Sequence, residues 1–249
     1  MLWYEKGGSG ARAIVLLHGL GATSGVWAGV QRVLDERGMG RWIAPDLNGH
    51  GLSGAQADYS VGSLAVELAE LLRGERELFI IGHSLGVYLG LALASGWFGV
   101  DVVGLVGLGG KISWPDADIR AARELATRPV RWYTTPEEAW SRYRRVAGLD
   151  SSFAPGEESL RHGVVQGEQG WRLSQDPRTF NVAGAPFASL ASSARTRFIL
   201  ARGQHDTMVS TAELRQYCHD SYDVGAAGHN AHVEKPGDIV ALLEKLVPP

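Results

Sequence analysis

Four short apolar runs, each followed directly by a glycine-containing turn, form the clearest pattern along the chain. They cover residues 14–17, 78–81, 102–108 and 196–201. Apolar runs of this length that do not alternate with polar residues indicate strands buried on both faces, as in parallel sheets. We therefore expect these four runs to be central strands of one sheet.

Helix-like segments lie between these runs. Residues 61–72 carry apolar side chains close to a 3.6-residue period, residues 87–94 follow the second run directly, and residues 239–247 close the chain with an amphipathic pattern. Strands that alternate with helices predict right-handed βαβ units. The predicted fold class is α/β, with a mostly parallel, doubly wound sheet and helices on both of its faces.

Residues 112–195 interrupt this alternation. They contain no strong apolar strand run and are rich in helix-forming residues, aromatic residues and prolines. The interruption falls where the carboxyl ends of parallel strands open onto a binding site. We therefore predict a core formed by residues 1–111 and 196–249, with residues 112–195 as a mostly helical lid. The alternative is that this segment is an extra helical layer of the core.

Composition narrows the range of functions. The chain has 249 residues and a net charge of −3, so nothing favours a nucleic-acid partner. A single cysteine, Cys218, allows neither an internal disulfide nor a CxxC zinc site. The N-terminus lacks the pattern of a signal peptide, and no apolar run is long enough to span a membrane. We expect a cytoplasmic protein that needs no metal or other cofactor and no membrane partner.

A motif for nucleophilic catalysis follows the second apolar run. Residues 82–86 read Gly-His-Ser-Leu-Gly and match G-x-S-x-G between an expected strand and an expected helix. A serine on such a tight turn has a strained backbone, and side chains at Gly82 and Gly86 would collide with neighbouring backbone. The turn lifts the hydroxyl of Ser84 clear of the sheet, near a helix N-terminus that favours an oxyanion. We predict that Ser84 is a nucleophile.

Serine requires a general base, and the chain offers eight histidines. His229 lies on a glycine-rich loop between the expected last strand and the last helix, so it is the preferred base, with His232 as its rival. His18 lies in the first glycine-containing loop, which it is expected to order through hydrogen bonds, and His50 is expected to be structural. His83 precedes the nucleophile, and its side chain is expected to point away from Ser84.

An acid is needed to orient the base. Asp206 follows the fourth apolar run, and the order Ser84, Asp206, His229 is that of α/β-hydrolases. The alternatives are Asp116 and Asp118, which lie further from the end of the preceding strand. Asp206 could also be a turn or capping aspartate.

The oxyanion formed during acyl transfer needs backbone donors. One is expected to be the amide of Leu85, directly after the nucleophile. The other is expected from the loop after the first apolar run, at Leu20. Glycines on both sides of Leu20 allow the backbone of this loop to approach a substrate closely.

The aromatic residues of the predicted lid are candidates for the substrate pocket. Trp114, Trp132 and Trp140 would suit an apolar acyl or aryl group, although they could instead pack the lid onto the core. Arginines in the same segment are more simply explained as solvated helix positions than as ligands of a substrate carboxylate. They are Arg120, Arg123, Arg128 and Arg131. Arg142, Arg144 and Arg145 are expected to form a solvated helix face and not a nucleic-acid contact.

The chain resembles the α/β-hydrolase superfamily, in its lid-bearing, serine esterase-like branch. The matching motifs occur in order along the chain: HGLG (18–21), PDLNGHGLS (45–53), GHSLG (82–86), GQHD (203–206) and GHNAHVEKP (228–236). The resemblance implies an α/β-hydrolase fold and a triad of Ser84 as nucleophile, Asp206 as acid and His229 as base. It also implies that residues 112–195 form a lid.

Several activities remain open within this resemblance. Hydrolysis of a carboxylic ester of a small, apolar molecule is the leading prediction, while carbon–carbon bond hydrolysis of a diketone or lactone hydrolysis would use the same triad. A non-catalytic binding scaffold on the same fold is a further alternative. The imperfect glycine pattern after Gly19 argues against a dinucleotide site, and a serine at position 84 argues against a dehalogenase. The expected partner is a small-molecule substrate, with the protein a monomer or homodimer.

Overall fold

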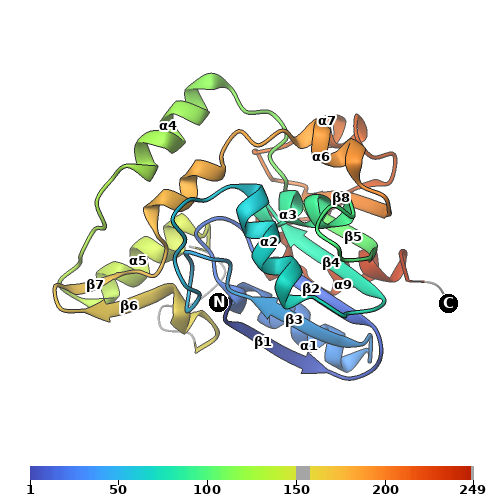
Figure 1. The fold of residues 1–249 in the computed structure, drawn as a ribbon, viewed down its shortest axis with the longest axis horizontal. Coiled ribbons are helices and arrows are strands. Elements are labelled where there is room, and N and C mark those ends of the chain that lie inside the picture. The colour runs from blue at the N-terminus through green and yellow to red at the C-terminus, as the bar shows by residue number, and fades with distance from the viewer. Residues whose placement is uncertain (150–157, 248–249) are drawn as a thin grey trace.

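The protein is represented by a computed structural model that describes residues 1–149 and 158–247 (Figure 1). Within these residues the main sheet has seven strands in the order β1-β3-β2-β4-β5-β8-β9. Only β1 is antiparallel to its neighbour, and the other pairs are parallel. The strands are β1 (Tyr4–Gly8), β2 (Ala13–Leu17), β3 (Arg41–Pro45), β4 (Leu78–His83), β5 (Val102–Leu108), β8 (Arg197–Gly203) and β9 (Ser221–Val224).

Alternate residues of the central strands enter two separate apolar cores, one on each face of the sheet. Ile14 and Leu16 belong to the core beneath α1 (Ala28–Glu36) and α9 (Pro236–Glu244). Val15 and Leu17 belong to the other core, beneath α2 (Val61–Leu71) and α3 (Leu85–Ala94). Every residue of β2 is therefore buried, which explains the unbroken apolar runs. The predicted α/β class with a mostly parallel sheet is confirmed.

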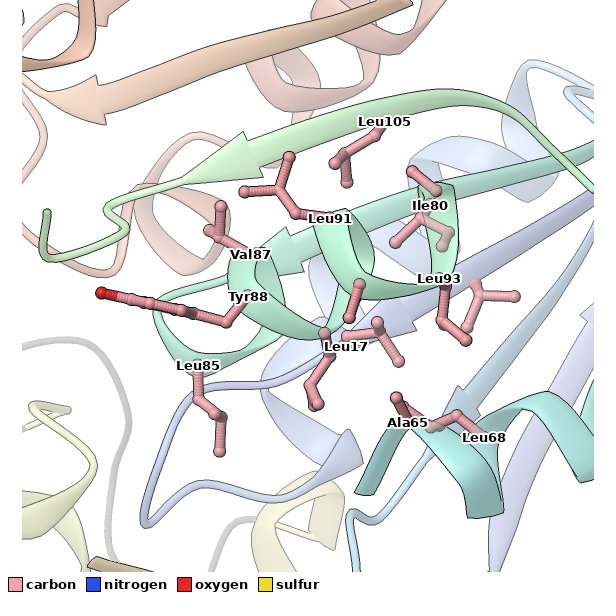
Figure 2. Close-up of a cluster of buried hydrophobic side chains, with 14 of the residues drawn as sticks. Leu17, Ala65, Leu68, Ile80, Leu85, Val87, Tyr88, Leu91, Leu93 and Leu105 are labelled. Atoms are coloured by element: carbon pink, nitrogen blue, oxygen red, sulfur yellow. The ribbon is translucent and has the colours of Figure 1, made fainter. Parts of the chain in front are cut away.

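Figure 2 shows how α3 is held against the sheet. Val87 and Leu91 of this helix lie toward Leu105 of β5, and α3 is buried along its whole length. The ring of Tyr88 lies at the end of the same cluster. Because α3 begins directly after Ser84, this packing fixes the position of the turn that carries the predicted nucleophile.

Between β5 and β8 the chain forms the segment that Figure 1 draws from green to orange, most of it at the left and upper left of the view. Its described part combines helices with an antiparallel hairpin, β6–β7, that the sequence pattern did not predict. The hairpin strands have four residues each and carry no unbroken apolar run, and only Val164 among their residues is buried. The elements are α4 (Asp116–Ala126), α5 (Pro136–Val146), η2 (Glu158–Gly163), β6 (Val164–Gly167), β7 (Gly170–Leu173), η3 (Pro177–Val182) and α6 (Phe187–Ser193).

The last helix of this segment packs as part of the core. Phe187 and Ala191 of α6 are buried in the same core as α3, and the ring of Phe187 lies 5.5 Å from that of Tyr88. The predicted domain ranges also include residues 150–157 and 248–249, which lie outside the described residues. The shorter elements that complete the fold are η1 (Ser24–Trp27), α7 (Thr211–Arg215) and α8 (Ala231–Glu234).

Among the described residues, no helix is both long enough and apolar enough to cross a bilayer.

Candidate active site

Ser84 occupies a strained turn between β4 and α3. Its φ of 51° and ψ of −108° are unusual for a residue other than glycine, and its amide donates a 2.8 Å hydrogen bond to the carbonyl of Leu108. A Cβ at Gly82 would lie 2.3 Å from the Gly86 carbonyl oxygen, and one at Gly86 would lie 2.1 Å from that of Leu17. The predicted steric requirement for both glycines is confirmed.

The predicted catalytic residues all line one cavity of about 620 Å³. The cavity wall includes Ser84, Asp206, His229, Leu20 and Leu85. These residues come from three widely separated parts of the chain, and they meet because β2, β4 and β8 are parallel strands whose carboxyl ends share one edge of the sheet.

Asp206 and His229 form the central polar contact of the site. His229 Nδ1 donates to Asp206 Oδ2 over 2.9 Å, and Asp206 Oδ1 accepts a 2.8 Å hydrogen bond from the amide of Met208. Asp206 is buried, so the bond holds the proton on Nδ1 and leaves Nε2 as the acceptor. Among the described residues, no hydrogen bond joins Ser84 Oγ to His229. Bonds of this kind commonly tighten only when substrate is bound.

Gly109 explains how the acid and base fit beside the sheet. It follows β5 with a φ of 60°, and a Cβ there would lie 3.1 Å from both Asp206 Oδ2 and the ring of His229. A side chain at this position would press on the acid–base pair. The glycine after the third apolar run is therefore part of the site, a role that the sequence pattern alone did not reveal.

His83 and His232 form a buried stack behind His229. The rings of His83 and His229 lie 4.6 Å apart, and His83 Nε2 donates to the carbonyl of His229 over 3.0 Å. His83 therefore supports the loop that carries the predicted base. The sequence led us to expect only that the His83 side chain points away from Ser84, and this supporting role was not predicted. His232 lies 4.3 Å from His83 and 4.4 Å from Trp27, measured between ring centroids.

His232, the rival candidate for the base, is fully buried. Neither of its ring nitrogens has a hydrogen-bond partner among the described residues, and burial lowers the pKa of His232 from 6.5 to about 3. It is therefore a neutral ring that packs like an aromatic side chain. Burial also lowers the pKa of His83 well below its usual value.

The buried, neutral ring of His232 predicts how the stability of the protein depends on pH. Because its pKa in the folded protein lies below 6.5, the unfolded chain binds this proton more readily. The stabilising effect is thus complete above pH 6.5 and is lost as the pH falls toward 3. When the pH falls from 7 to 5, we expect the wild type to lose about 2 kcal/mol more unfolding free energy than His232→Phe loses. Urea unfolding of both proteins at the two pH values measures this, and parallel pH dependences would contradict it.

The loop that carries Leu20 is braced by two buried histidines. His18 Nδ1 donates to the Gly19 carbonyl over 2.8 Å, and its Nε2 accepts from the amide of Leu47 over 2.9 Å. His50 Nε2 accepts from the amide of Gly21 over 3.1 Å. Burial lowers the pKa of His18 to about 4 and that of His50 to about 3, so each ring keeps a neutral acceptor nitrogen. The predicted ordering role of His18 and the predicted structural role of His50 are confirmed.

The two predicted oxyanion donors stand at the edge of the cavity. Leu85 is the first residue of α3, where the helix dipole favours negative charge. In the Leu20 loop, the amide of Gly21 is taken by His50 and that of Ala22 by the Gly19 carbonyl. Within the described part of the chain, no acceptor lies on the amide of Leu20 or Leu85, so both are available to a ligand.

Of the three predicted tryptophans, the structure brings only Trp114 to this cavity. Its Nε1 donates to the hydroxyl of Tyr88 over 2.8 Å, and Tyr88 in turn donates to the carbonyl of Lys111. Burial raises the pKa of Tyr88 to about 12, which keeps this hydroxyl protonated. Trp132 instead lies beside Arg172 of the hairpin, with the guanidinium 5.7 Å from its ring. Trp140 packs against Tyr143, with ring centroids 5.6 Å apart.

Arg142 and Arg145 of α5 have a position that the sequence did not predict. Both line the cavity together with Val146, because residues three and four apart in α5 share a face of the helix. Their side chains are exposed on one side, as predicted, but they also border the cavity that contains Ser84. The period of the helix was visible in the sequence, whereas the side of α5 that meets the site was not.

The alternative acids lie at the start of α4. Asp116 and Asp118 are in its first turn, and Asp118 forms an ion pair with Lys111. His229 pairs with Asp206 instead. Across the described residues, no group of three or more His, Cys, Asp or Glu side chains is placed to hold a metal ion.

Comparison with curated proteins gives relatives that align with nearly the whole chain. An uncharacterized protein of Mycobacterium tuberculosis is 31% identical over 97% of this chain and 71% of its own length. The 2-succinyl-6-hydroxy-2,4-cyclohexadiene-1-carboxylate synthase of Shigella dysenteriae is 27% identical over 98% of this chain and 96% of the synthase.

Solved structures give the same fold. A thioesterase domain from the curacin biosynthetic pathway is similar with a TM-score of 0.78 at 19% identity, over 97% of this chain and 94% of that domain. An esterase of Mycobacterium tuberculosis is similar with a TM-score of 0.70 at 21% identity, over 99% of this chain and 91% of the esterase. Residues 14–242 match the model of the Alpha/beta hydrolase family. The sheet, its connections and this match together establish that the chain belongs to the Alpha/beta hydrolase family.

Proposed function

We propose that this protein is a serine hydrolase that cleaves a carboxylic ester, or a related acyl bond, of a small molecule. The observation that carries the proposal is the 2.9 Å bond between His229 Nδ1 and Asp206 Oδ2 in the cavity that also contains Ser84 on its strained turn. A nucleophile, a base and an acid at one edge of the sheet form the arrangement that acyl transfer requires.

The proposed reaction has two halves. Ser84 Oγ attacks the carbonyl carbon while His229 Nε2 takes the hydroxyl proton, and the amides of Leu20 and Leu85 stabilise the oxyanion. His229 then gives the proton to the leaving alcohol as the bond to carbon breaks, which leaves an acyl group on Ser84. Water next attacks this acyl group, with His229 as base, and releases the carboxylic acid.

The segment of residues 112–195 serves in this proposal as the lid over the site. Trp114 precedes α4, Val146 ends α5, and Phe180 and Val182 belong to η3, and all four border the cavity. With Leu20, Leu85 and Met208 they give the cavity an apolar wall that suits an acyl or aryl group.

Asp206→Asn tests the acid. An amide at this position favours the wrong tautomer of His229, so we expect kcat to fall by about 10⁴-fold, with little change in the fold. Steady-state kinetics with a 4-nitrophenyl ester measures the loss, and Asp118→Asn is the matched control because it replaces the alternative acid. A loss confined to Asp118→Asn would assign the role of the acid to that residue.

The proposed function is tested by covalent labelling together with turnover. A fluorophosphonate probe is expected to modify Ser84, as mapped by peptide mass spectrometry, and to abolish hydrolysis of short-chain 4-nitrophenyl esters. Labelling at another residue would refute the assignment of the nucleophile. Labelling at Ser84 without turnover of any ester would favour the binding-scaffold alternative.

A second activity on the same triad stays open. The Shigella dysenteriae protein, which aligns over 98% of this chain, is named as a synthase and not as a hydrolase. Carbon–carbon bond hydrolysis of a diketone and lactone hydrolysis are the alternatives that we retain. Adding a vinylogous diketone and a lactone to the ester panel separates them, because each substrate reports one bond type. Cytoplasmic localisation and a monomeric or homodimeric state stay predictions.

A further inference from the structure

The cavity that contains Ser84 is unusually rich in positive charge for an otherwise apolar site. Three basic side chains line it: Lys111, Arg142 and Arg145. Among the described residues of this wall the single carboxylate is that of Asp206, which is already engaged by His229 and by the amide of Met208. The protein as a whole has a net charge of −3, so this positive charge is a local property of the site.

The two arginines are available to a ligand. In the described part of the chain, no acidic side chain forms an ion pair with Arg142 or Arg145. Glu138, one turn before Arg142 on α5, is instead turned back to the start of the helix, where it accepts a 3.1 Å hydrogen bond from the amide of Thr134. Lys111 differs, because it is paired with Asp118 and lies 4.5 Å from the centre of the Trp114 ring.

The wall of the cavity around these arginines is apolar. Val146 and Ala147 follow them on α5 and its end, and Phe180 and Val182 of η3 border the same space. Apolar neighbours strengthen the attraction between a guanidinium and an anion. A guanidinium also matches a carboxylate in shape, with two parallel hydrogen bonds. Two arginines that have no acidic partner among the described residues favour an anionic ligand over a neutral one.

We propose that the substrate carries a carboxylate in addition to the ester that is cleaved, and that Arg142 and Arg145 bind this carboxylate. This inference rests on the proposed function, and it narrows the substrate class to anionic esters such as half-esters of dicarboxylic acids. Both arginines act as specificity-determining residues, since they contact a part of the substrate away from the reacting carbonyl.

Matched pairs of esters test the proposal. The carboxylate can lie in the acyl part or in the leaving group, so two pairs are needed. The first is mono-4-nitrophenyl glutarate against 4-nitrophenyl pentanoate, and the second is 4-(butyryloxy)benzoate against its methyl ester. Wild-type protein is expected to prefer the anionic member of at least one pair in kcat/KM.

The variant Arg142→Gln/Arg145→Gln is expected to lower kcat/KM for that anionic ester by roughly 10- to 100-fold, mainly through KM. The neutral ester should change by no more than about twofold, because neither arginine touches the reacting atoms. Arg123→Gln, an exposed arginine of α4 away from the cavity, is the matched control and should change neither ester. Equal losses for anionic and neutral esters, or no loss in either pair, would overturn the proposal.

A separate measurement distinguishes failure of the proposed function from failure of the carboxylate site. If no ester is hydrolysed and Ser84 is not labelled, calorimetric titration of the same four compounds still measures binding. Arginine-dependent binding of an anionic member would then support the carboxylate site without the serine hydrolase. Binding that does not differ between the wild type and the double variant would refute the site itself.

Discussion

Ser84→Ala is expected to reduce kcat by about 10⁶-fold, which is the scale of loss when the nucleophile of a serine triad is removed. Without the hydroxyl no acyl-enzyme forms, and the His229–Asp206 pair has no proton to accept. The remaining rate would come from the two amide donors and from binding of the substrate alone. Burst kinetics with a 4-nitrophenyl ester measures the effect, because the burst of 4-nitrophenol disappears together with steady turnover.

The same variant is expected to fold normally. Alanine at position 84 keeps the Cβ that the strained φ of 51° already accommodates, so the unfolding free energy should change little. Ser189→Ala, at an exposed position on α6, is the matched control and should leave kcat unchanged. Activity of Ser84→Ala within tenfold of the wild type, after removal of contaminating esterase, would show that the nucleophile lies elsewhere.

His229→Ala is expected to cause a loss of similar size, about 10⁶-fold in kcat. The imidazole is the one base that Asp206 orients, and its removal leaves the Ser84 hydroxyl protonated and weakly nucleophilic. Labelling of Ser84 by a fluorophosphonate should slow in parallel, because this reaction also depends on the base. Stopped assays at high protein concentration are needed to measure the remaining rate.

His232→Phe separates the two candidate histidines. The ring of His232 lies against those of Trp27 and His83, and phenylalanine retains the size and stacking of the ring. We therefore expect this variant to keep kcat within a few-fold of the wild type. If His232→Phe loses activity while His229→Ala retains it, the assignment of the base must be reversed.

The fold could be predicted because its physical signals are local. A parallel sheet covered on both faces needs unbroken apolar strands, and β2, β4 and β5 carry such runs in the sequence. The hairpin β6–β7 could not be predicted in this way. Its strands are short and only partly buried, and they depend on contacts with α5, which neighbouring residues in the sequence do not encode.

Some features of the candidate site could likewise be predicted from the sequence, and others could not. The strand-to-helix turn at Ser84 has a local signature, since Gly82 and Gly86 are required by steric contact with nearby backbone. The positions of Asp206 and His229 follow from motifs after later strands, and their roles stay predictions. The contact of Gly109 with the acid–base pair carried no sequence signal, because it joins segments about a hundred residues apart.

The sequence by itself thus determined the strand and helix pattern, the strained turn and the side chains able to perform acyl transfer. These properties depend on local sterics, periodicity and residue chemistry. Only the tertiary structure decided that Trp114 borders the cavity while Trp132 and Trp140 do not, and that Arg142 and Arg145 turn toward it. The reason is physical: which side of α5 borders the cavity depends on how this helix packs against elements that are distant in the sequence.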